Sequence, residues 1–197
     1  YWYDNNFQFS NYIDLMNRSF KNLITYHCIG NHDNDFKATS NAAAKNPFVR
    51  SIAPAYYSFN IDAAHYIVLD NIDCSKYDGS TSRNYSEKIY QPQMQWLRKD
   101  LSYVDKATPV FIMMHAPAYR PSTGTEFRYN IEGVSDLMAA VRDYNEVHLV
   151  TGHTHKNAVA TSEASILKSY PNVTEHNQGS VCGDWWWSGH LTPGALT

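Results

Sequence analysis

Charged residues, cysteine and long hydrophobic runs are all scarce in this chain of 197 residues. Lys, Arg, Asp and Glu make up 18% of it and give a net charge of −3, with no basic run, so nucleic acid is not expected as a structural partner. No apolar segment approaches the ~20 residues that a membrane-spanning helix needs. Three cysteines without a Cys-x-x-Cys spacing leave the redox compartment open.

The composition is that of a folded protein. Hydrophobic residues make up 43% of the chain and aromatic residues 14%, which suits one domain over residues 1–197 with a sizeable core. The first residue is Tyr and no signal peptide is visible, so we expect the native gene product to start earlier. The Asn- and Tyr-rich composition leans towards an exported, periplasmic bacterial protein, although the sequence leaves the compartment and the oligomeric state undetermined.

Helical and strand-like patterns alternate along the chain. Apolar residues spaced by three and four predict helices that begin near Ser10, Pro92 and Val134. Apolar runs predict strands at 25–29, 56–60, 65–69, 109–114 and 146–151, and further strands near 156–162, 164–170 and 173–183. Residues 34–55 are predicted to form a long loop, with a helical turn at Ala42 to Lys45, because Pro47 and Pro54 interrupt them. This alternation favours an α/β fold, in which ligands bind outside the carboxyl ends of the strands.

Three polar motifs each follow a predicted strand. They are Gly30-Asn31-His32-Asp33, the isolated His115, and Gly152-His153-Thr154-His155. Two-metal hydrolysis of phosphate esters requires mixed nitrogen and oxygen ligands. Imidazole suits Zn and Fe, whereas carboxylate and carbonyl oxygens suit Mn and Mg. The motifs therefore offer the side chains that such a site needs.

Each motif also has an ordinary structural interpretation. Gly-Asn-His-Asp alone could form an Asx turn, and a single His115 could be a hydrogen-bonded core histidine. His153 and His155 alone could be exposed loop histidines. Because all three motifs follow strands, we expect them to meet in one site at the carboxyl edge of the sheet.

In these motifs the chain resembles the calcineurin-like metallophosphoesterase family, and in Gly183-Asp184-Trp185-Trp186 a bacterial subgroup of it in which a further C-terminal domain often follows. The resemblance runs from about Tyr12 to Trp187. It implies an α/β/β/α sandwich of two mixed sheets. It also implies a hydrolase that cleaves phosphate mono- or diesters by in-line attack of a metal-bridging hydroxide, with two divalent ions drawn from Mn, Fe, Zn and Mg.

The resemblance also implies roles for single residues. Asn31, His115 and His153 correspond to ligands of one metal, and His155 to a ligand of the other. His32 corresponds to the residue that hydrogen-bonds the phosphate or protonates the leaving group, with Asp33 orienting it. Outside these motifs, Arg120 could neutralise a substrate phosphate, or it could be a solvated loop charge.

The chain departs from the family pattern before Gly30. The family's Asp-x-His and Gly-Asp motifs, which include a bridging carboxylate, have no counterpart in the 29 residues that precede Gly30. We therefore expect a domain that is incomplete at its N-terminus, with empty or partly occupied metal sites and little hydrolysis on its own. Two alternatives stay open: a non-catalytic scaffold or interaction domain that retains half of the metal site, and a single-zinc module that uses His115, His153 and His155.

Overall fold

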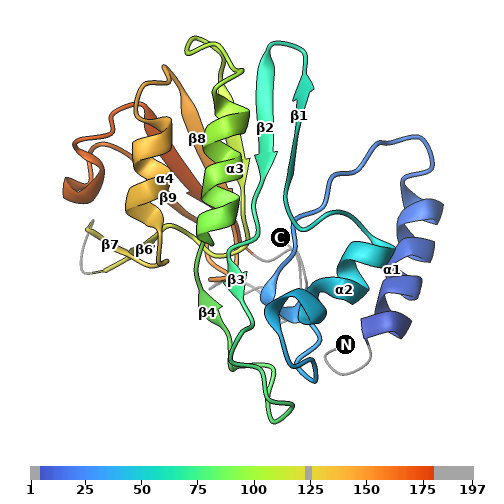
Figure 1. The fold of residues 1–197 in the computed structure, drawn as a ribbon. Coiled ribbons are helices and arrows are strands. Elements are labelled where there is room, and N and C mark those ends of the chain that lie inside the picture. Colours follow the sequence, from blue (N-terminus) through green and yellow to red (C-terminus); the bar gives the residue numbers. More distant parts are fainter. Residues whose placement is uncertain (1–4, 123–125, 180–197) are drawn as a thin grey trace, which may run out of the picture.

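The computed structural model describes residues 5–122 and 126–179, and a six-stranded mixed sheet is its largest element (Figure 1). In spatial order the strands are β1 (Tyr57–Ile61), β2 (Ala64–Val68), β5 (Val110–Met113), β8 (Val147–Thr151), β10 (Val173–Asn177) and β9 (Ala158–Ala160). The four central strands are parallel, whereas β1 and β9 pair antiparallel at the two edges. The predicted α/β class is confirmed, and the hairpin of β1 and β2 lies where the sequence predicts it.

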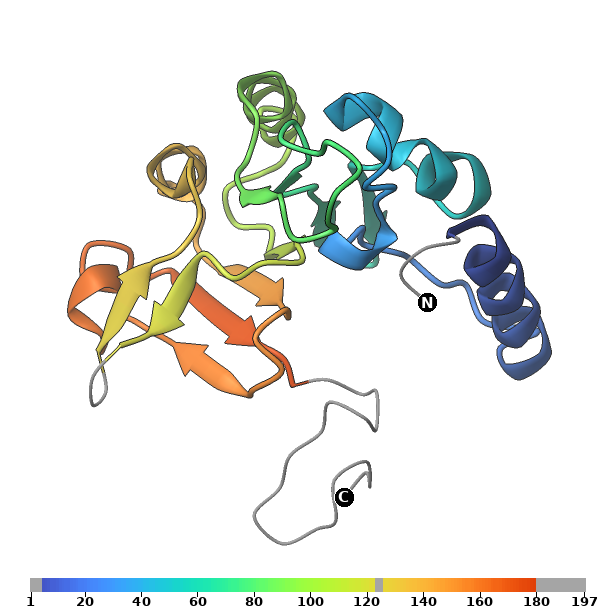
Figure 2. The same ribbon diagram turned by 90° about the horizontal axis from the view of Figure 1, so that it is seen from below.

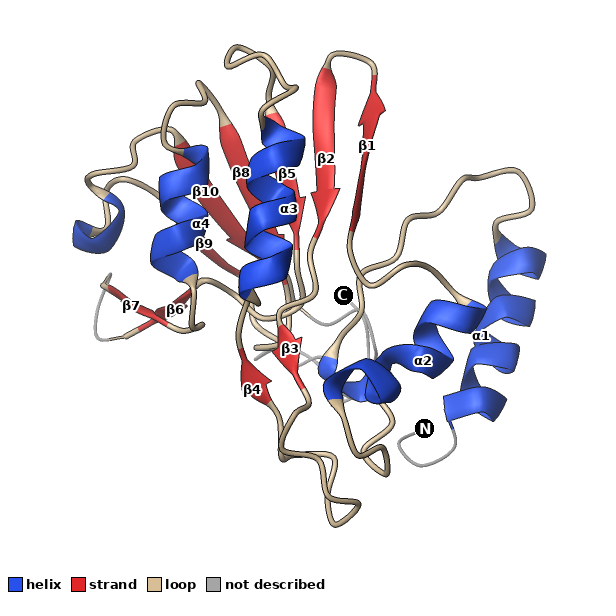
Figure 3. Cartoon of the chain, viewed as in Figure 1, coloured by secondary structure: helices blue, strands red, loops and turns tan. Residues whose placement is uncertain are grey.

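Helices α3 (Gln91–Leu101) and α4 (Val134–Val141) lie against one face of this sheet (Figures 1 and 3). Pro92 lies in the first turn of α3, where its missing N–H costs no hydrogen bond. The core between helices and sheet is apolar and fully buried, and its largest members include Met94, Leu97, Leu137, Met138, Ile112 and Leu149. None of the helices in the described ranges has the length and hydropathy needed to cross a bilayer.

The opposite face of the sheet carries a continuous row of rings. Phe59, Tyr66, Phe111, His148 and His176 come from five successive strands, with neighbouring centroids 5.3, 5.0, 4.8 and 5.3 Å apart. Since side chains alternate between the two faces of a strand, these five residues point away from the α3 and α4 side. His148 therefore has a packing role in this row, as its position inside a predicted strand suggests.

An N-terminal layer lies beyond the β1 edge of the sheet (Figure 2). It contains α1 (Asn5–Ser19), the 3₁₀ turn η1 (Asn31–Asp33) and α2 (Asn41–Ser51). The rings of Phe9 in α1 and Phe48 in α2 meet at 6.0 Å, and both pack with the fully buried Ile29. This small second core positions the segment that runs into Gly30.

The prediction of a loop over residues 34–55 was wrong in its extent of helix, because the turn predicted at Ala42 to Lys45 is part of the longer helix α2. Ser40 caps the helix by accepting a hydrogen bond from the backbone N–H of Ala43 at 3.2 Å, and Ala44 and Phe48 are buried beneath it. Pro47 lies inside the helix without ending it. The capping bond and the buried face therefore outweigh the intrinsic cost of an internal proline.

Two predicted strands do not form. Residues 23–30 belong to no strand. At His27 the Tyr57 hydroxyl takes the place of a neighbouring strand, because it accepts from the His27 N–H and donates to the His27 carbonyl, each at 2.9 Å. In 164–170 the structure has the 3₁₀ turn η2 (Ser165–Leu167), which closes through the Leu167 N–H on the Ala164 carbonyl at 3.0 Å.

Two small sheets complete the described elements. One pairs β3 (Ile72–Asp73) with β4 (Ser86–Glu87), and the other pairs β6 (Tyr119–Pro121) with β7 (Phe127–Tyr129). Both form within polar stretches for which the sequence predicts no strand. They bring Glu87 and Arg120 towards the carboxyl edge of the main sheet.

A buried ion pair joins the N-terminal layer to the sheet. Lys45 of α2 contacts the Asp70 carboxylate just after β2, and its ammonium also donates to the Ile72 carbonyl at 2.8 Å. The two side chains are only 7% and 6% exposed. The Gln93 side chain of α3 in turn binds both backbone groups of Asp70, at 2.8 and 2.6 Å. This pair therefore connects α2, the sheet and α3.

Replacing Lys45 with alanine should lower the free energy of unfolding by about 3–5 kcal/mol, because the Asp70 carboxylate is then buried without its cation. Lys37→Ala is the matched control: Lys37 is exposed, so its loss should change stability by less than about 0.5 kcal/mol. Urea unfolding followed by circular dichroism measures both. Equal, small effects of the two substitutions would contradict a structural role for the pair.

Candidate functional site

The loops that carry the predicted site leave one edge of the sheet. Because β2, β5, β8 and β10 are parallel, their carboxyl ends all lie at the edge to which the β2 arrowhead points in Figure 3. Met113 of β5 pairs with Val150 of β8, and the Gly152 N–H donates to the His115 carbonyl at 2.9 Å, which extends the pairing beyond both strands. His115 therefore lies directly beside the loop that contains His153.

Three of the predicted metal ligands converge on a single point. The Nε2 atom of His115 lies 2.6 Å from the Oδ1 atom of Asn31 and 3.0 Å from the Nδ1 atom of His153. These residues are 84 and 38 positions from His115 in the sequence. Burial, and then the neighbouring His153, His32 and His155, lower the pKa of His115 to about 3. Its imidazole is therefore neutral at physiological pH, the form that binds metal.

Gly30 allows this close approach. A Cβ atom at this position would lie 2.8 Å from the Nδ1 atom of His115, closer than atoms can pack. The same residue anchors the turn that presents Asn31: its N–H donates to the Asp33 carboxylate at 2.7 Å, and its carbonyl accepts from the Asn34 side chain at 2.8 Å. The close packing of the His115 ring thus explains why the first position of the Gly-Asn-His-Asp motif is a glycine.

The Gly152–His155 loop has an unusual backbone. His153 and His155 have φ angles of +68° and +60°, in the left-handed region that residues with a side chain rarely adopt. Asn177 of β10 holds this loop, because its amide donates to the Gly152 carbonyl at 2.6 Å and its side-chain oxygen accepts from the Thr154 hydroxyl. Strain of this kind persists only where the surrounding structure fixes it.

His32 and His155 lie close enough to His153 for their charges to interact. The pKa of His32 is lowered by burial first, and then by the nearby His153, His155 and Arg83. The pKa of His155 is lowered by burial and by His153. All four predicted histidines therefore belong to one neighbourhood, while the separate roles of His32 and His155 stay predictions.

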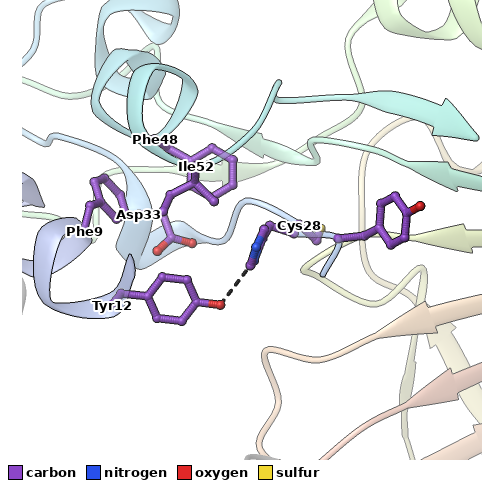
Figure 4. Close-up of a pocket in the computed structure, with 8 residues that line it drawn as sticks. Phe9, Tyr12, Cys28, Asp33, Phe48 and Ile52 are labelled. Carbon is purple, nitrogen blue, oxygen red and sulfur yellow. Dashed lines mark hydrogen bonds between the residues drawn. The ribbon is translucent and has the colours of Figure 1, made fainter. Parts of the chain in front are cut away.

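Asp33 faces the N-terminal layer. Its side chain lines a cavity of about 400 Å³ with Phe9 and Tyr12 of α1, Cys28, and Phe48 and Ile52 at the end of α2 (Figure 4). Burial raises the pKa of Asp33 to about 6, although the hydrogen bond from the Gly30 N–H opposes that shift. The carboxylate therefore fixes the Gly30 turn, and its expected action on His32 stays a prediction.

Arg120 lies beside the histidines but is paired with a carboxylate. Its guanidinium donates to the Oε1 atom of Glu87 at 2.8 Å, and the same oxygen lies 3.1 Å from the Nε2 atom of His153. Asn130 donates to the other carboxylate oxygen. Arg120 is thus neither an isolated solvated charge nor an unpaired cation. The sequence does not single out Glu87, because it lies in a polar stretch without a motif.

Two further buried polar residues hold the His115 loop. Asn71, which directly precedes β3, binds both backbone groups of Ala116, at 2.7 and 3.0 Å. Glu175 of β10 accepts from the N–H groups of Ala118 and Tyr119, each at 2.8 Å, and from the Thr151 hydroxyl at 2.9 Å. The sequence analysis does not single out Glu175. The one signal that could have indicated its role is that a charged residue lies within a predicted strand.

The converging atoms fit one divalent metal ion. Ligands at about 2.0–2.2 Å from a shared ion lie roughly 3 Å apart, which is close to the separations around His115. The set is mixed, with two imidazole nitrogens and one carboxamide oxygen, as expected for Zn, Fe or Mn. Within residues 5–122 and 126–179, no three His, Cys, Asp or Glu side chains are placed to hold a metal ion together. The third donor of this set is instead the carboxamide of Asn31, which is neutral.

Comparisons with known proteins agree with these motifs. A family model described as "Calcineurin-like phosphoesterase" matches residues 2–157. A solved structure titled "Structure of PhoD" is similar at 15% identity and a TM-score of 0.45, over 71% of this chain and 34% of that chain. The chain thus spans about a third of the length of that structure, and nothing further is drawn from so distant a likeness. No curated protein matches the chain.

Gly30→Ala should lower the free energy of unfolding by about 1–3 kcal/mol, because the added methyl group displaces the His115 ring. Gly152→Ala is the matched control: its Cβ would meet only the His115 carbonyl oxygen, at 3.9 Å, and should cause no loss. Chemical unfolding measures stability, and the imidazole NMR signals of His115 should move only in Gly30→Ala. Unmoved signals in that variant would contradict the close approach.

The stability of the protein should also depend on pH through Glu175. Burial raises its pKa from 4.5 to about 7 against the opposing hydrogen bonds. Because the folded state holds the proton more tightly, this contribution is complete below pH 4.5 and is lost as the pH rises through 7. Between pH 5 and pH 8 the wild-type protein should lose about 2–3 kcal/mol more stability than Glu175→Gln, as measured by urea unfolding. Identical pH profiles would contradict this assignment.

Proposed function

This chain belongs to the calcineurin-like phosphoesterase family, and on that premise we propose that it forms part of a metal-dependent enzyme that hydrolyses phosphate mono- or diesters. The observation that carries the proposal is the convergence of Asn31 and His153 on the Nε2 atom of His115. These residues come from three separate segments of the chain, and each has a side-chain atom that can donate a lone pair to a metal ion. The family as a whole supports metal-dependent phosphoester hydrolysis.

In this proposal Asn31, His115 and His153 hold one divalent ion, and His155 contributes to a second. Bound metal would supply hydroxide for in-line attack on phosphorus at neutral pH and would neutralise charge on the phosphoryl oxygens. His32, close to both His153 and His155, hydrogen-bonds the phosphoryl oxygen or donates a proton to the leaving oxygen. Asp33 fixes the turn that carries His32 through its bond with the Gly30 N–H.

A cavity next to His153 supports an ester substrate rather than phosphate alone. It has a volume of about 470 Å³ and is lined by Arg120, Pro121, Thr154, Lys156, Asn157 and Ala158 in addition to His153. A space of this size beside the proposed ion could hold the alcohol part of the substrate. Lys156 contributes a cationic side chain to its lining, whereas the charge of Arg120 is paired with Glu87.

A non-catalytic scaffold is the second candidate. It is favoured by one observation, the lack of a carboxylate among the three converging ligands in the part of the chain that the structure describes. A bridging carboxylate normally holds the two ions of such a centre together. The two candidates differ in whether phosphate esters are turned over at all.

Hydrolysis of p-nitrophenyl phosphate and bis(p-nitrophenyl) phosphate in the presence of Mn²⁺ tests the proposal. His115→Ala and Asn31→Ala should each lower kcat/KM by at least about tenfold, the scale on which single metal-site partners act. His148→Gln is the control, because His148 lies in the ring row on the face of the sheet away from α3 and α4. Turnover in the wild-type protein that is no higher than in His115→Ala would contradict the proposal.

A further inference from the structure

The His153 imidazole has a defined neighbour at each of its two nitrogen atoms. Its Nδ1 atom faces the Nε2 atom of His115 at 3.0 Å, inside the cluster with Asn31. Its Nε2 atom faces the Oε1 atom of Glu87 at 3.1 Å, outside the cluster. The ring is therefore held between a group of donor atoms and a carboxylate.

The carboxylate decides which nitrogen carries the proton. An ionised carboxylate can only accept hydrogen bonds, so the Nε2 atom of His153 must donate to it. A neutral imidazole with its proton on Nε2 has a free lone pair on Nδ1. That lone pair is then directed at the point where Asn31 and His115 meet. A ring with the opposite tautomer would lose the bond to Glu87 and direct a proton into the cluster.

We propose that Glu87 is a positioning residue that fixes the tautomer and ring orientation of His153, so that its Nδ1 atom is preset to bind a divalent cation together with Asn31 and His115. The metal part of this inference rests on the proposed function. Carboxylates that bind the remote nitrogen of a metal-ligating histidine commonly orient the ring and raise its basicity. Nothing in the sequence motifs marks Glu87 for this role.

Glu87 is itself held rigidly. It lies in β4, where it pairs with Ile72 of β3, and its side chain is only 17% exposed. Its Oε1 atom accepts from Arg120 at 2.8 Å, and its other oxygen accepts from the Asn130 amide. Asn130 also donates to the Pro117 carbonyl at 2.8 Å, two residues after His115. The carboxylate thus links the His115 loop to His153.

This network assigns Arg120 a different role from the one that its sequence position suggests. Its guanidinium balances the charge of Glu87 and holds that carboxylate in place, so Arg120 acts on His153 through Glu87. A direct phosphate contact would instead use guanidinium N–H groups that do not bind Glu87. The two roles predict different behaviour when both residues are changed.

The tautomer of His153 can be measured in the metal-free protein without any variant. Two-bond ¹H–¹⁵N NMR spectra distinguish a protonated ring nitrogen from one with a free lone pair. We expect His153 to be neutral with its proton on Nε2 in most molecules. A spectrum in which Nδ1 carries the proton would overturn the proposal, whether or not the protein hydrolyses any ester.

Glu87→Gln tests the role of the carboxylate. It should produce a mixture of His153 tautomers and weaken Mn²⁺ binding by about 10–100-fold in isothermal titration calorimetry. Glu132→Gln makes the same chemical change at a carboxylate that is 70% exposed and pairs with Lys88, and should leave both measurements unchanged. A Glu87→Gln protein with the wild-type tautomer would overturn the proposal.

A double-substitution cycle separates the two roles of Arg120. If Arg120 acts through Glu87, Arg120→Gln should alter the His153 tautomer in the wild-type background but add nothing further to Glu87→Gln. Independent, additive effects would overturn this part of the proposal. Because these readouts use no substrate, hydrolysis that does not depend on His115 or Asn31 would refute the proposed function while leaving the assignment of Glu87 intact.

Discussion

The parallel pairing of β5 with β8 is the constraint on which the candidate site depends. It places the residues after Met113 beside the residues after Val150, and the hydrogen bond from Gly152 to His115 extends that register into the two loops. Two histidines that are 38 positions apart in the sequence are thereby brought within 3.0 Å of each other. A slip in the register of β5 against β8 would expose apolar side chains of the core, so this register is fixed. The loops that follow the two strands are therefore held in fixed positions as well.

Polar side chains from other elements then fix the loops. Asn71, Asn177 and Glu175 bind backbone groups of the two loops rather than each other, so they specify main-chain paths that the loop sequences alone would not adopt. The left-handed backbone at His153 and His155 shows how strongly these paths are determined. Glu87 then fixes the tautomer and the orientation of the His153 ring. The site is therefore built from η1, from the loops after β5 and β8 and from residues of β4 and β10, with the predicted ligands at its centre.

Part of this arrangement could be predicted from the sequence. The motifs at His115 and His153 follow strands β5 and β8, and the general behaviour of parallel sheets brings such positions together, whereas the run before Asn31 forms no strand. Periodicity also located α3 and α4 close to their observed bounds. What could not be predicted depends on tertiary contacts. Helix α2 forms despite Pro47 because of its cap and buried face, and the backbone of His27 bonds to the Tyr57 hydroxyl instead of a strand. Glu87 belongs to no motif, because its role arises only from proximity to His153. The Trp-rich segment from Gly183 lies outside the described residues.

A crystal of the protein soaked with Mn²⁺ and measured at a wavelength with anomalous signal tests the central claim most directly. The account predicts an anomalous peak within about 2.0–2.3 Å of the Oδ1 atom of Asn31, the Nε2 atom of His115 and the Nδ1 atom of His153 together. A peak that contacts His153 through its Nε2 atom, a peak elsewhere in the molecule, or no peak at saturating Mn²⁺ would contradict it.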